Sequence, residues 1–178
     1  MFDKILVALD LNDSYESPFA QALSLAAQTK AKLVLLQVLD AEDSYAAPFP
    51  YYAGTTGYPL VFDETLWSRY QAEYKAHQEQ GKRILERLVK QAIAAGVNAE
   101  FIQAQGDAGK RICNCAQLQK VDLVIVGSHG RRGFQEFLMG SVSNYVMHRA
   151  PCTVMIAREK DCHKNTVNDT HNMADMPV

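Results

Sequence analysis

A stretch rich in glycine and serine, GSHGRRGFQEFLMGSVS, follows the apolar run VDLVIV and carries the strongest chemical signal in the chain. Two residues separate Gly127 from Gly130, and nine more precede Gly140 and Ser141. Glycines after a strand would let the backbone take positive φ angles and approach a ligand without a Cβ in the way. If a helix begins at Ser141, its first N–H groups have no internal partners and carry the positive end of the helix dipole. The stretch therefore predicts a site for an anion such as phosphate, to which Ser141 and Ser143 add hydroxyl donors.

Two other phosphate-binding patterns are absent from the sequence. No G-x4-G-K-[ST] run occurs, which excludes a Walker-type P-loop. No G-x-G-x-x-G follows the first predicted strand, which argues against a dinucleotide-dependent dehydrogenase. A glycine pair alone more often makes a plain turn, so the prediction depends on the longer spacing.

Residues that would catalyse a reaction at such a site are harder to find. Hydrolysis needs a base near the terminal phosphate and usually a Lys or Arg that stabilises charge. We interpret His129 as a local hydrogen-bonding residue, and Arg131 and Arg132 as a solvent-exposed pair. The four cysteines lack the spacing of a zinc site. We therefore predict no catalytic residue and no dedicated metal ligand.

Composition limits the classes of protein that the chain could form. Its 178 residues are 48% hydrophobic and 21% charged, which suits one compact domain with a sizeable core. Lys and Arg total 18 against 20 for Asp and Glu, which argues against a nucleic-acid binder. No apolar run reaches the roughly 20 residues of a membrane span, and no signal-peptide pattern precedes the first strand, so we expect a cytoplasmic protein.

Apolar runs of strand length alternate with amphipathic helical patterns. We expect strands at residues 4–9, 32–38, 97–103, 121–126 and 152–157. We expect four helices. The first has its N-cap at Ser17 and its first residue at Pro18 and runs to about Thr29, and the second begins at about Glu64 and stops at Gly96. The third spans 108–119 after a cap at Asp107, and the fourth spans 141–149. The third strand alternates polar with apolar residues, which is typical of an edge strand.

This order of elements predicts the α/β class: a single domain with a doubly wound, five-stranded parallel sheet, Rossmann-like, in the strand order 3-2-1-4-5. Ligands of such sheets bind beyond the carboxyl ends of the strands, where the winding direction reverses. Asp10 follows the first strand, Val38 ends the second and Gly127 follows the fourth. If the first and fourth strands are neighbours, as in this strand order, these three residues surround one site.

Two segments do not fit the alternating pattern. Residues 41–63 contain prolines, glycines and tyrosines without a regular period, so we expect an insertion that forms a lid, a partner surface or a partly disordered loop. Residues 159–178 are polar and predict a loosely ordered tail. On the helix after the insertion, we interpret Trp67, Tyr70 and Tyr74 as residues that cover apolar surface.

The G-x2-G-x9-G-[ST] spacing resembles the signature of the universal stress protein family, in its ATP-binding branch. KILVALD resembles the family's first strand with its acidic residue, LLQVLD the second strand, VDLVIVGSHG the fourth and APCTVMIAR the last. The resemblance implies one universal stress protein domain at residues 1–158, with the tail at 159–178 outside it. It also implies the fold of the adenine nucleotide alpha hydrolases, which is Rossmann-like.

The resemblance implies ATP or another adenine nucleotide as the ligand, with Mg²⁺ or Mn²⁺ among the phosphates. Val38 would meet the adenine edge through its backbone, Asp10 would lie beside the nucleoside, and Gly127 would lie beside the ribose. The phosphate cradle would consist of Gly130, Gly140, Ser141 and the backbone N–H of Val142, beside the predicted donor Ser143.

The implied function is a nucleotide-responsive stress or signalling module with little or no turnover. Two alternatives stay open at this point. One is a slow ATP hydrolase or phosphotransfer enzyme on the same site. The other is a sensor of AMP or a cyclic adenine dinucleotide, because the predicted phosphate-binding residues do not fix the number of phosphates in the ligand.

The last strand predicts a partner. Residues Cys152–Ala157 would lie at a sheet edge, and a bare apolar edge favours pairing with another strand. We therefore expect a homodimer joined by antiparallel contact of this strand with its mate, which agrees with the usual dimer of the family that the chain resembles. No downstream protein partner is assigned.

Overall fold

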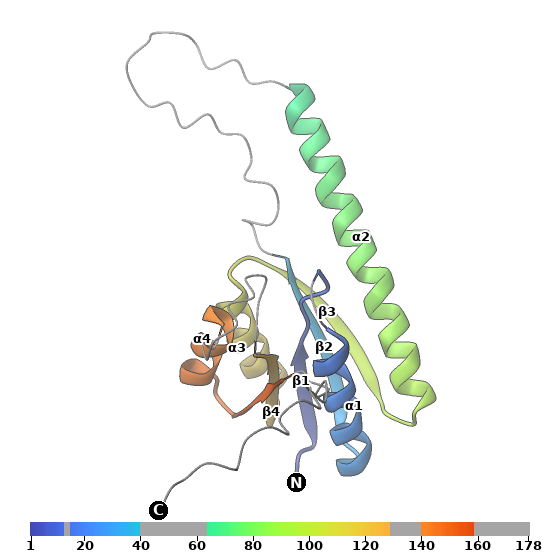
Figure 1. Cartoon of the computed structure of the whole chain (residues 1–178), viewed down its shortest axis with the longest axis vertical. Coiled ribbons are helices and arrows are strands. Elements are labelled where there is room, and N and C mark those ends of the chain that lie inside the picture. The colour runs from blue at the N-terminus through green and yellow to red at the C-terminus, as the bar shows by residue number, and fades with distance from the viewer. Residues whose placement is uncertain (13–14, 40–63, 129–139, 159–178) are drawn as a thin grey trace, which may run out of the picture.

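The computed structural model describes residues 1–12, 15–39, 64–128 and 140–158. The strands in these ranges are β1 (Lys4–Ala8), β2 (Lys32–Leu39), β3 (Ala99–Gln105), β4 (Leu123–Gly127) and β5 (Thr153–Ala157). The helices are α1 (Glu16–Thr29), α2 (Glu64–Ala94), α3 (Ala108–Gln119) and α4 (Ser141–Arg149). All strand pairs are parallel, and the order is β3-β2-β1-β4-β5 (Figure 1). The predicted fold class, strand order and edge position of the third strand are confirmed.

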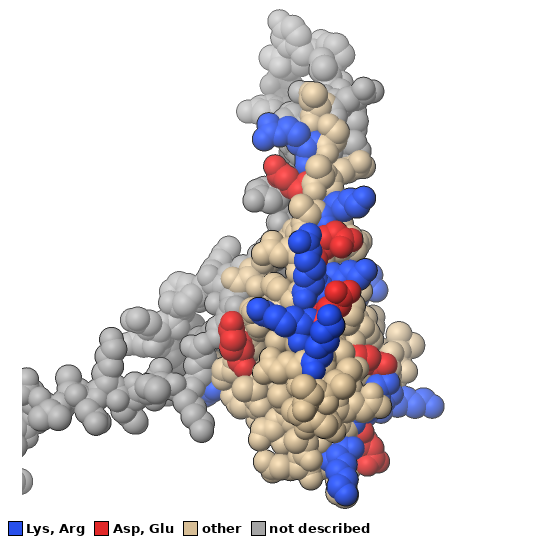
Figure 2. All heavy atoms as spheres, turned by 90° about the vertical axis from the view of Figure 1, so that its right-hand side faces the viewer, with Lys and Arg blue, Asp and Glu red and all other residues tan. Residues whose placement is uncertain are grey.

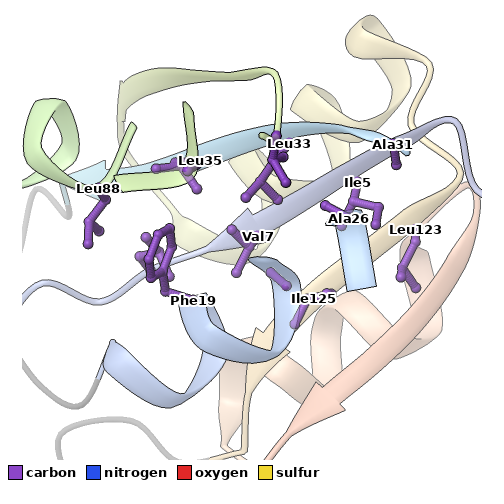
Figure 3. Close-up of a cluster of buried hydrophobic side chains, with 14 of the residues drawn as sticks. Ile5, Val7, Phe19, Ala26, Ala31, Leu33, Leu35, Leu88, Leu123 and Ile125 are labelled. Atoms are coloured by element: carbon purple, nitrogen blue, oxygen red, sulfur yellow. The ribbon is translucent and has the colours of Figure 1, made fainter. Parts of the chain in front are cut away.

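Helices cover both faces of the sheet, which explains why its central strands are apolar on both sides. α1 and α2 lie on one face, and α3 and α4 lie on the other (Figure 1). Successive side chains of β1 enter different cores: Ile5 and Val7 face α1 and α2, whereas Leu6 faces α3 and α4. Figure 3 shows the first of these cores, where Phe19 of α1 and Leu88 of α2 pack on the strands.

The first helix begins earlier than predicted. The sequence pattern places the N-cap at Ser17 and the first helical residue at Pro18, but α1 already begins at Glu16. Pro18 is tolerated there because N–H groups of a first turn have no helical partner, and Phe19 N then donates to the chain four residues earlier (3.1 Å). The Ser17 hydroxyl instead donates to Arg158 O (3.2 Å), which ties α1 to the end of β5.

Two strands begin later than predicted because the residues before them complete helix ends. Gly96, at φ 79°, ends α2 as predicted, and Val97 N donates back to Ala92 O (3.0 Å). Val121 N likewise donates to Ala116 O (3.1 Å) at the end of α3. β3 and β4 therefore begin two residues after their predicted bounds, and β5 begins one residue after its own.

Asp122 joins the two central strands at their amino ends. Its Oδ2 accepts from Asp3 N (2.8 Å) and Lys4 N (2.9 Å), and its own N–H donates to Lys4 O (2.9 Å). These backbone donors, Lys4 N first, lower the pKa of the Asp122 carboxyl. The clamp helps to hold the register of β1 with β4, whose opposite ends form the candidate site.

α2 is much longer than the sheet that it covers. Its buried apolar residues Leu85, Leu88 and Ala92 lie in its second half, and its first half projects beyond the carboxyl ends of the strands (Figure 1). Tyr74 is half-buried, while the side chains of Trp67 and Tyr70 lie outside the described part of the structure. Their predicted covering role therefore stays a prediction.

The insertion at 41–63 and the tail at 159–178 also lie outside the described residues, so their predicted roles and the domain boundary at 158 are not tested. Among the helices that are described, none has the length and apolar character needed to cross a membrane.

Candidate functional site

The sheet reverses its winding between its two central strands. β1 pairs with β2 on one side and with β4 on the other, where Val7 lies opposite Leu35 and Ile125. The chain leaves β1 toward β2 and β3, and later crosses back to β4 and β5. The carboxyl ends of β1, β2 and β4 therefore lie at the edge position where open parallel sheets bind their ligands.

Asp10 lies two residues beyond β1. Leu9 N donates to Leu36 O (2.8 Å), which extends the pairing of β1 with β2 by one bond before the chain turns. The Asp10 side chain is exposed, and its Oδ1 accepts from Asn12 N (3.1 Å). This bond closes a short turn of the kind that aspartate favours, and it holds the carboxylate at the sheet edge.

The backbone of Val38 faces the space beyond the end of β1. Leu36 O points to the β1 side, because it accepts from Leu9 N, whereas Leu39 O points to the β3 side and accepts from Gly106 N (3.0 Å). Alternate residues of a parallel strand direct their N–H and C=O groups to the same side. The backbone groups of Val38 therefore lie on the β1 side, one step past the bond from Leu9.

Gly127 is the last residue of β4 and lies opposite Ala157 of β5. Ser128 N continues this pairing by donating to Ala157 O (2.9 Å). The expected positive φ angle at the strand exit is wrong for Gly127, because positive φ among the described glycines occurs at Gly96 and Gly106. A residue that still belongs to a strand has an extended backbone. What glycine offers at this position is therefore the absence of a side chain, and not an unusual backbone angle.

The first turn of α4 is held directly against the end of β4. Gly140 N donates to Ser128 O (3.1 Å), so the chain that leaves β4 returns to the same place. Gly140 is the N-cap of α4, with φ −57° and ψ 153°, and it has no side chain that could cap the helix. Ser141 and Val142 follow and are exposed. The start of α4 thus presents first-turn N–H groups at the sheet edge without a side-chain cap.

Ser143 occupies a different place from Ser141. Its side chain is 2% exposed, and its hydroxyl donates to Gly140 O (2.8 Å). Asn144 N donates to the same oxygen (2.9 Å). The hydroxyl proton of Ser143 is therefore used inside the helix start, where it holds Gly140, which differs from the donor role that the sequence pattern predicts.

Gly130, His129, Arg131 and Arg132 lie outside the described residues, and their predicted roles are not tested. Every other predicted site residue lies at the ends of β1, β2 and β4 or in the first turn of α4.

The close packing of α3 on α4 also helps to position the candidate site, and no motif in the sequence predicts it. At Gly109, in the first turn of α3, an added Cβ would lie 2.7 Å from Cδ1 and 2.9 Å from Cγ of Tyr145. Tyr145 follows about one turn after the start of α4, so this glycine lets α3 support the helix whose first turn lines the site. Glycine inside a helix costs about 1 kcal/mol relative to alanine, and this cost is the signal that could have revealed the contact.

α3 begins at the same edge of the sheet as α4, but its first turn is closed. Asp107 Oδ1 accepts from Lys110 N (2.9 Å) and caps α3 as predicted. Gly106, at φ 116°, turns the chain between β3 and this cap. A carboxylate of the chain itself thus already complements the positive end of the α3 dipole.

The described cysteines do not form a reactive group at this edge. Cys113, Cys115 and Cys152 are free and half-buried, and burial is the main cause that raises the pKa of each thiol. Thiols with raised pKa stay protonated at neutral pH and are weak nucleophiles. Within the described ranges, no group of three or more His, Cys, Asp or Glu side chains is arranged to hold a metal ion.

Sequence comparison finds relatives that share one family name. Universal stress protein YxiE of Bacillus subtilis is 34% identical over 158 residues, which is 89% of this chain and 100% of that protein. Universal stress protein Slr1101 of Synechocystis is 36% identical over 104 residues, which is 58% of this chain and 96% of that protein.

Solved structures share the fold. Protein MJ0577 of Methanocaldococcus jannaschii has a TM-score of 0.72 at 21% identity, and the match covers 90% of this chain and 99% of that one. A universal stress protein in complex with cAMP has a TM-score of 0.57 at 22% identity, over 88% of this chain and 97% of that one. The universal stress protein of Archaeoglobus fulgidus in complex with dAMP has a TM-score of 0.56 at 15% identity, over 87% of this chain and 97% of that one.

The family model of the universal stress protein family matches residues 1–158. The chain therefore belongs to the universal stress protein family.

Proposed function

We propose that this chain binds an adenine nucleotide at the carboxyl edge of its sheet and acts as a nucleotide-responsive stress or signalling module with little or no turnover. The observation that carries the proposal is the bond from Gly140 N to Ser128 O (3.1 Å), which holds the uncapped start of α4 at the end of β4. An anion placed there meets N–H donors and the positive end of a helix dipole. The complexes of related folds with cAMP and dAMP support an adenine nucleotide as the class of ligand.

The start of α4 is assigned to the phosphates. The N–H groups of Ser141 and Val142 and the exposed hydroxyl of Ser141 supply donors, and Gly140 leaves room for the ligand because it has no Cβ. Bonds of this kind to a charged acceptor contribute about 1.5 to 3 kcal/mol each. Against an association cost of about 4 to 15 kcal/mol, they support a dissociation constant on the order of micromolar. Gly130 keeps its proposed place in the cradle.

The strand ends are assigned to the nucleoside. The N–H and C=O groups of Val38 point past the end of β1, where they suit the donor and acceptor edge of adenine. Asp10 is exposed in the turn that follows the neighbouring strand β1, and it suits a ribose hydroxyl, which would donate to its carboxylate. Gly127 lies on the opposite side of β1 and leaves room for the sugar.

A divalent cation would arrive with the nucleotide. Mg²⁺ is commonly held by one or two carboxylates together with phosphate oxygens and waters. Asp10 and the Ser141 hydroxyl are oxygen donors of this type, so the edge suits a metal shared with the phosphates rather than a resident site. When bound, the cation would neutralise phosphate charge.

Little or no turnover is proposed because the assigned residues bind and orient the nucleotide but include no base placed to activate water. A slow hydrolase on the same site is the alternative. The complexes of proteins of similar fold with cAMP and dAMP favour a second candidate, a sensor of an adenine monophosphate. A helix N-terminus can bind a single phosphate as well as a triphosphate.

The nucleotide released from denatured, purified protein and the affinity for added nucleotide test the proposal together. Mass spectrometry identifies the released species, and calorimetry compares ATP and AMP with and without Mg²⁺. We expect adenine-nucleotide binding on the order of micromolar, with ATP intact after hours at 25 °C. Steady phosphate release that disappears in Ser141→Ala would favour the hydrolase, and a folded protein that binds no adenine nucleotide contradicts the proposal.

Gly140→Val separates the cradle from a plain turn. The φ and ψ of Gly140 lie in the extended region that β-branched residues adopt, so the fold should tolerate the substitution while the new side chain occupies ligand space. We expect at least about a thirtyfold loss of affinity, equivalent to about 2 kcal/mol. Ala94→Val, at the exposed end of α2 on the opposite edge of the sheet, is the control and should leave the affinity unchanged.

We also propose that the module is a homodimer through β5. Ala157 O faces β4, because it accepts from Ser128 N, so the N–H groups of the alternate residues Val154 and Ile156 point away from the sheet. Val154→Pro removes one outward donor without removing a bond to β4 and should give monomers in size-exclusion chromatography with light scattering. Val154→Thr keeps the donor and should stay dimeric; a dimeric proline variant argues against this interface.

A further inference from the structure

The loop that carries Asp10 is tied to α2 by side-chain hydrogen bonds. Asn12 N donates to Asp10 Oδ1 (3.1 Å), and Asn12 Oδ1 accepts from His77 Nε2 of α2 (3.0 Å). Asn12 thus holds the aspartate through its backbone and the helix through its side chain. These residues are far apart in the sequence, and the bond brings a helix on one face of the sheet to the proposed nucleoside side of the site.

A second bond ties the same loop to the same helix. Arg87 Nη2 of α2 donates to Tyr15 OH (2.9 Å), immediately before α1 begins. Arg87 lies ten residues after His77, close to three helical turns along α2. The chain between β1 and α1 therefore contacts α2 at Asn12 and at Tyr15, and the positions of these two residues depend on where α2 lies.

His77 stands where α2 leaves the sheet. The helix is anchored after it by Gly81, where an added Cβ would lie only 2.7 Å from Gln37 Nε2, and by the buried Leu85. Before it, every residue between Thr65 and Ala76 whose side chain is described is exposed, except the half-buried Tyr74. Figure 2 shows acidic and basic side chains interspersed along the outer face of α2. The bond from His77 is thus made at the boundary between the anchored half and the projecting half of the helix.

We propose that His77 is a positioning residue for the nucleotide site: through Asn12 it sets the place of the Asp10 carboxylate, and through the same bond nucleotide occupancy is transmitted to the projecting half of α2. The inference rests on the proposed function and adds to it the route by which the site communicates with the surface. Coupling between two sites is reciprocal, so a contact that helps α2 to position Asp10 also lets a ligand on Asp10 restrain α2.

Calorimetry with ATP and Mg²⁺ tests the first half of the proposal. His77→Ala and Asn12→Ala should each weaken binding about three- to tenfold, the range expected for one hydrogen bond. The double variant should lose no more than either single variant, because both remove the same bond. His77→Gln keeps an N–H donor at a similar reach and should restore the affinity, which a general loss of helix packing would not allow. Lys75→Ala, an exposed residue of the same helix, is the control.

Hydrogen exchange tests the second half. ATP with Mg²⁺ should slow exchange of the amides between Thr65 and Ala76 in the wild-type protein and in His77→Gln, but not in His77→Ala. If His77→Ala binds ATP with the same affinity as the wild-type protein, the positioning role is overturned and the proposed function stays intact. Equal slowing in His77→Ala overturns transmission through this bond. A wild-type protein that binds no adenine nucleotide overturns the proposed function itself.

Discussion

α3 and α4 lie on the same face of the sheet and begin at the same edge, but their first turns are built differently. Asp107 caps α3 by accepting from Lys110 N (2.9 Å), whereas α4 begins at Gly140, which has no side chain. In α4 the N-cap is instead held through its backbone, by Gly140 N to Ser128 O (3.1 Å) and by the Ser143 hydroxyl on Gly140 O (2.8 Å). The start of α4 is therefore fixed in place without using up its own first N–H groups.

Under the proposed function, this difference distinguishes the phosphate-binding helix start of α4 from the ordinary start of α3. Both helices have the same dipole and the same orphan N–H groups, so these features alone predict no ligand. α3 satisfies one of them with its own side-chain cap, whereas α4 is held by its N-cap backbone and has no side-chain cap. A helix start that is held in place and has no side-chain cap is what an anion site needs, because little reorganisation is required when the ligand binds.

Gly140→Asp should have the largest effect on nucleotide affinity, because it gives the start of α4 an aspartate cap like that of α3. The backbone angles of Gly140 suit an N-cap aspartate, whose carboxylate would accept from the first-turn N–H groups and repel phosphate. We expect nucleotide affinity to fall about a hundredfold, equivalent to about 2.7 kcal/mol, by calorimetry. The thermal midpoint should stay the same or rise slightly, since aspartate and glycine differ by only a few tenths of a kcal/mol as N-caps.

Gly140→Asn provides the matched control for charge. Asparagine caps the helix in the same way but carries no negative charge, so its loss of affinity should be smaller, about tenfold. Equal losses for the two variants would mean that blocking the donors matters and repulsion does not. An aspartate variant that binds nucleotide as the wild type does would contradict the assignment of phosphates to α4.

The fold, and the place of most candidate site residues at one edge of the sheet, could be predicted from the sequence because they depend on local patterns. Apolar runs identify the central strands, and strand order then places Asp10, Val38 and Gly127 at one edge. Boundaries depend on competition between local and distant partners. Ser17 has the chemistry of an N-cap, yet its hydroxyl donates to Arg158 O, which no local pattern indicates.

The parts of the site that the sequence did not predict are all set by contacts between distant segments or by side-chain direction. The clash that a Cβ at Gly109 would make with Tyr145 depends on how closely α3 approaches α4. The bond between His77 and Asn12 depends on where a long helix crosses a loop. Serine at the third helical position suits either a ligand or the chain, and only the packing of α4 shows that Ser143 bonds to its own N-cap.

Gly109→Ala should have an intermediate effect, on the free energy of unfolding, and it tests whether α3 supports the uncapped start of α4. The new Cβ would lie 2.7 Å from Tyr145 Cδ1, too close without a shift of the ring or of a helix. We expect the free energy of unfolding to fall by about 1 to 2 kcal/mol in urea titrations, because strain of about 1 to 3 kcal/mol outweighs the helix propensity of alanine.

Tyr145→Ala supplies the control for this contact. In that background the two closest contacts, with Cδ1 and Cγ, are gone and only the Cβ of residue 145 remains, 3.2 Å from the new Cβ. Gly109→Ala should then stabilise the protein by up to about 1 kcal/mol through helix propensity. The sign of the effect should therefore reverse between the two backgrounds. A stabilising Gly109→Ala substitution in the presence of Tyr145 would show that the two helices are not in close contact there.

Asp107→Ala should have the smallest effect on the ligand and tests the closed helix start. Removing the cap leaves orphan N–H groups on α3 and should lower the free energy of unfolding by about 1 kcal/mol, whereas Asp107→Asn should retain nearly all of the stability. The exposed contact of Lys110 Nζ with Asp107 Oδ2 (3.9 Å) adds little to this figure. Calorimetry should show unchanged nucleotide affinity and one bound nucleotide per chain, because the bond to a strand end before α3 is made by Gly106, which precedes the N-cap (Gly106 N to Leu39 O, 3.0 Å), whereas in α4 the N-cap itself is held by such a bond. A second bound nucleotide would mean that an uncapped helix start is sufficient by itself, and the distinction drawn between the two helices would then be wrong.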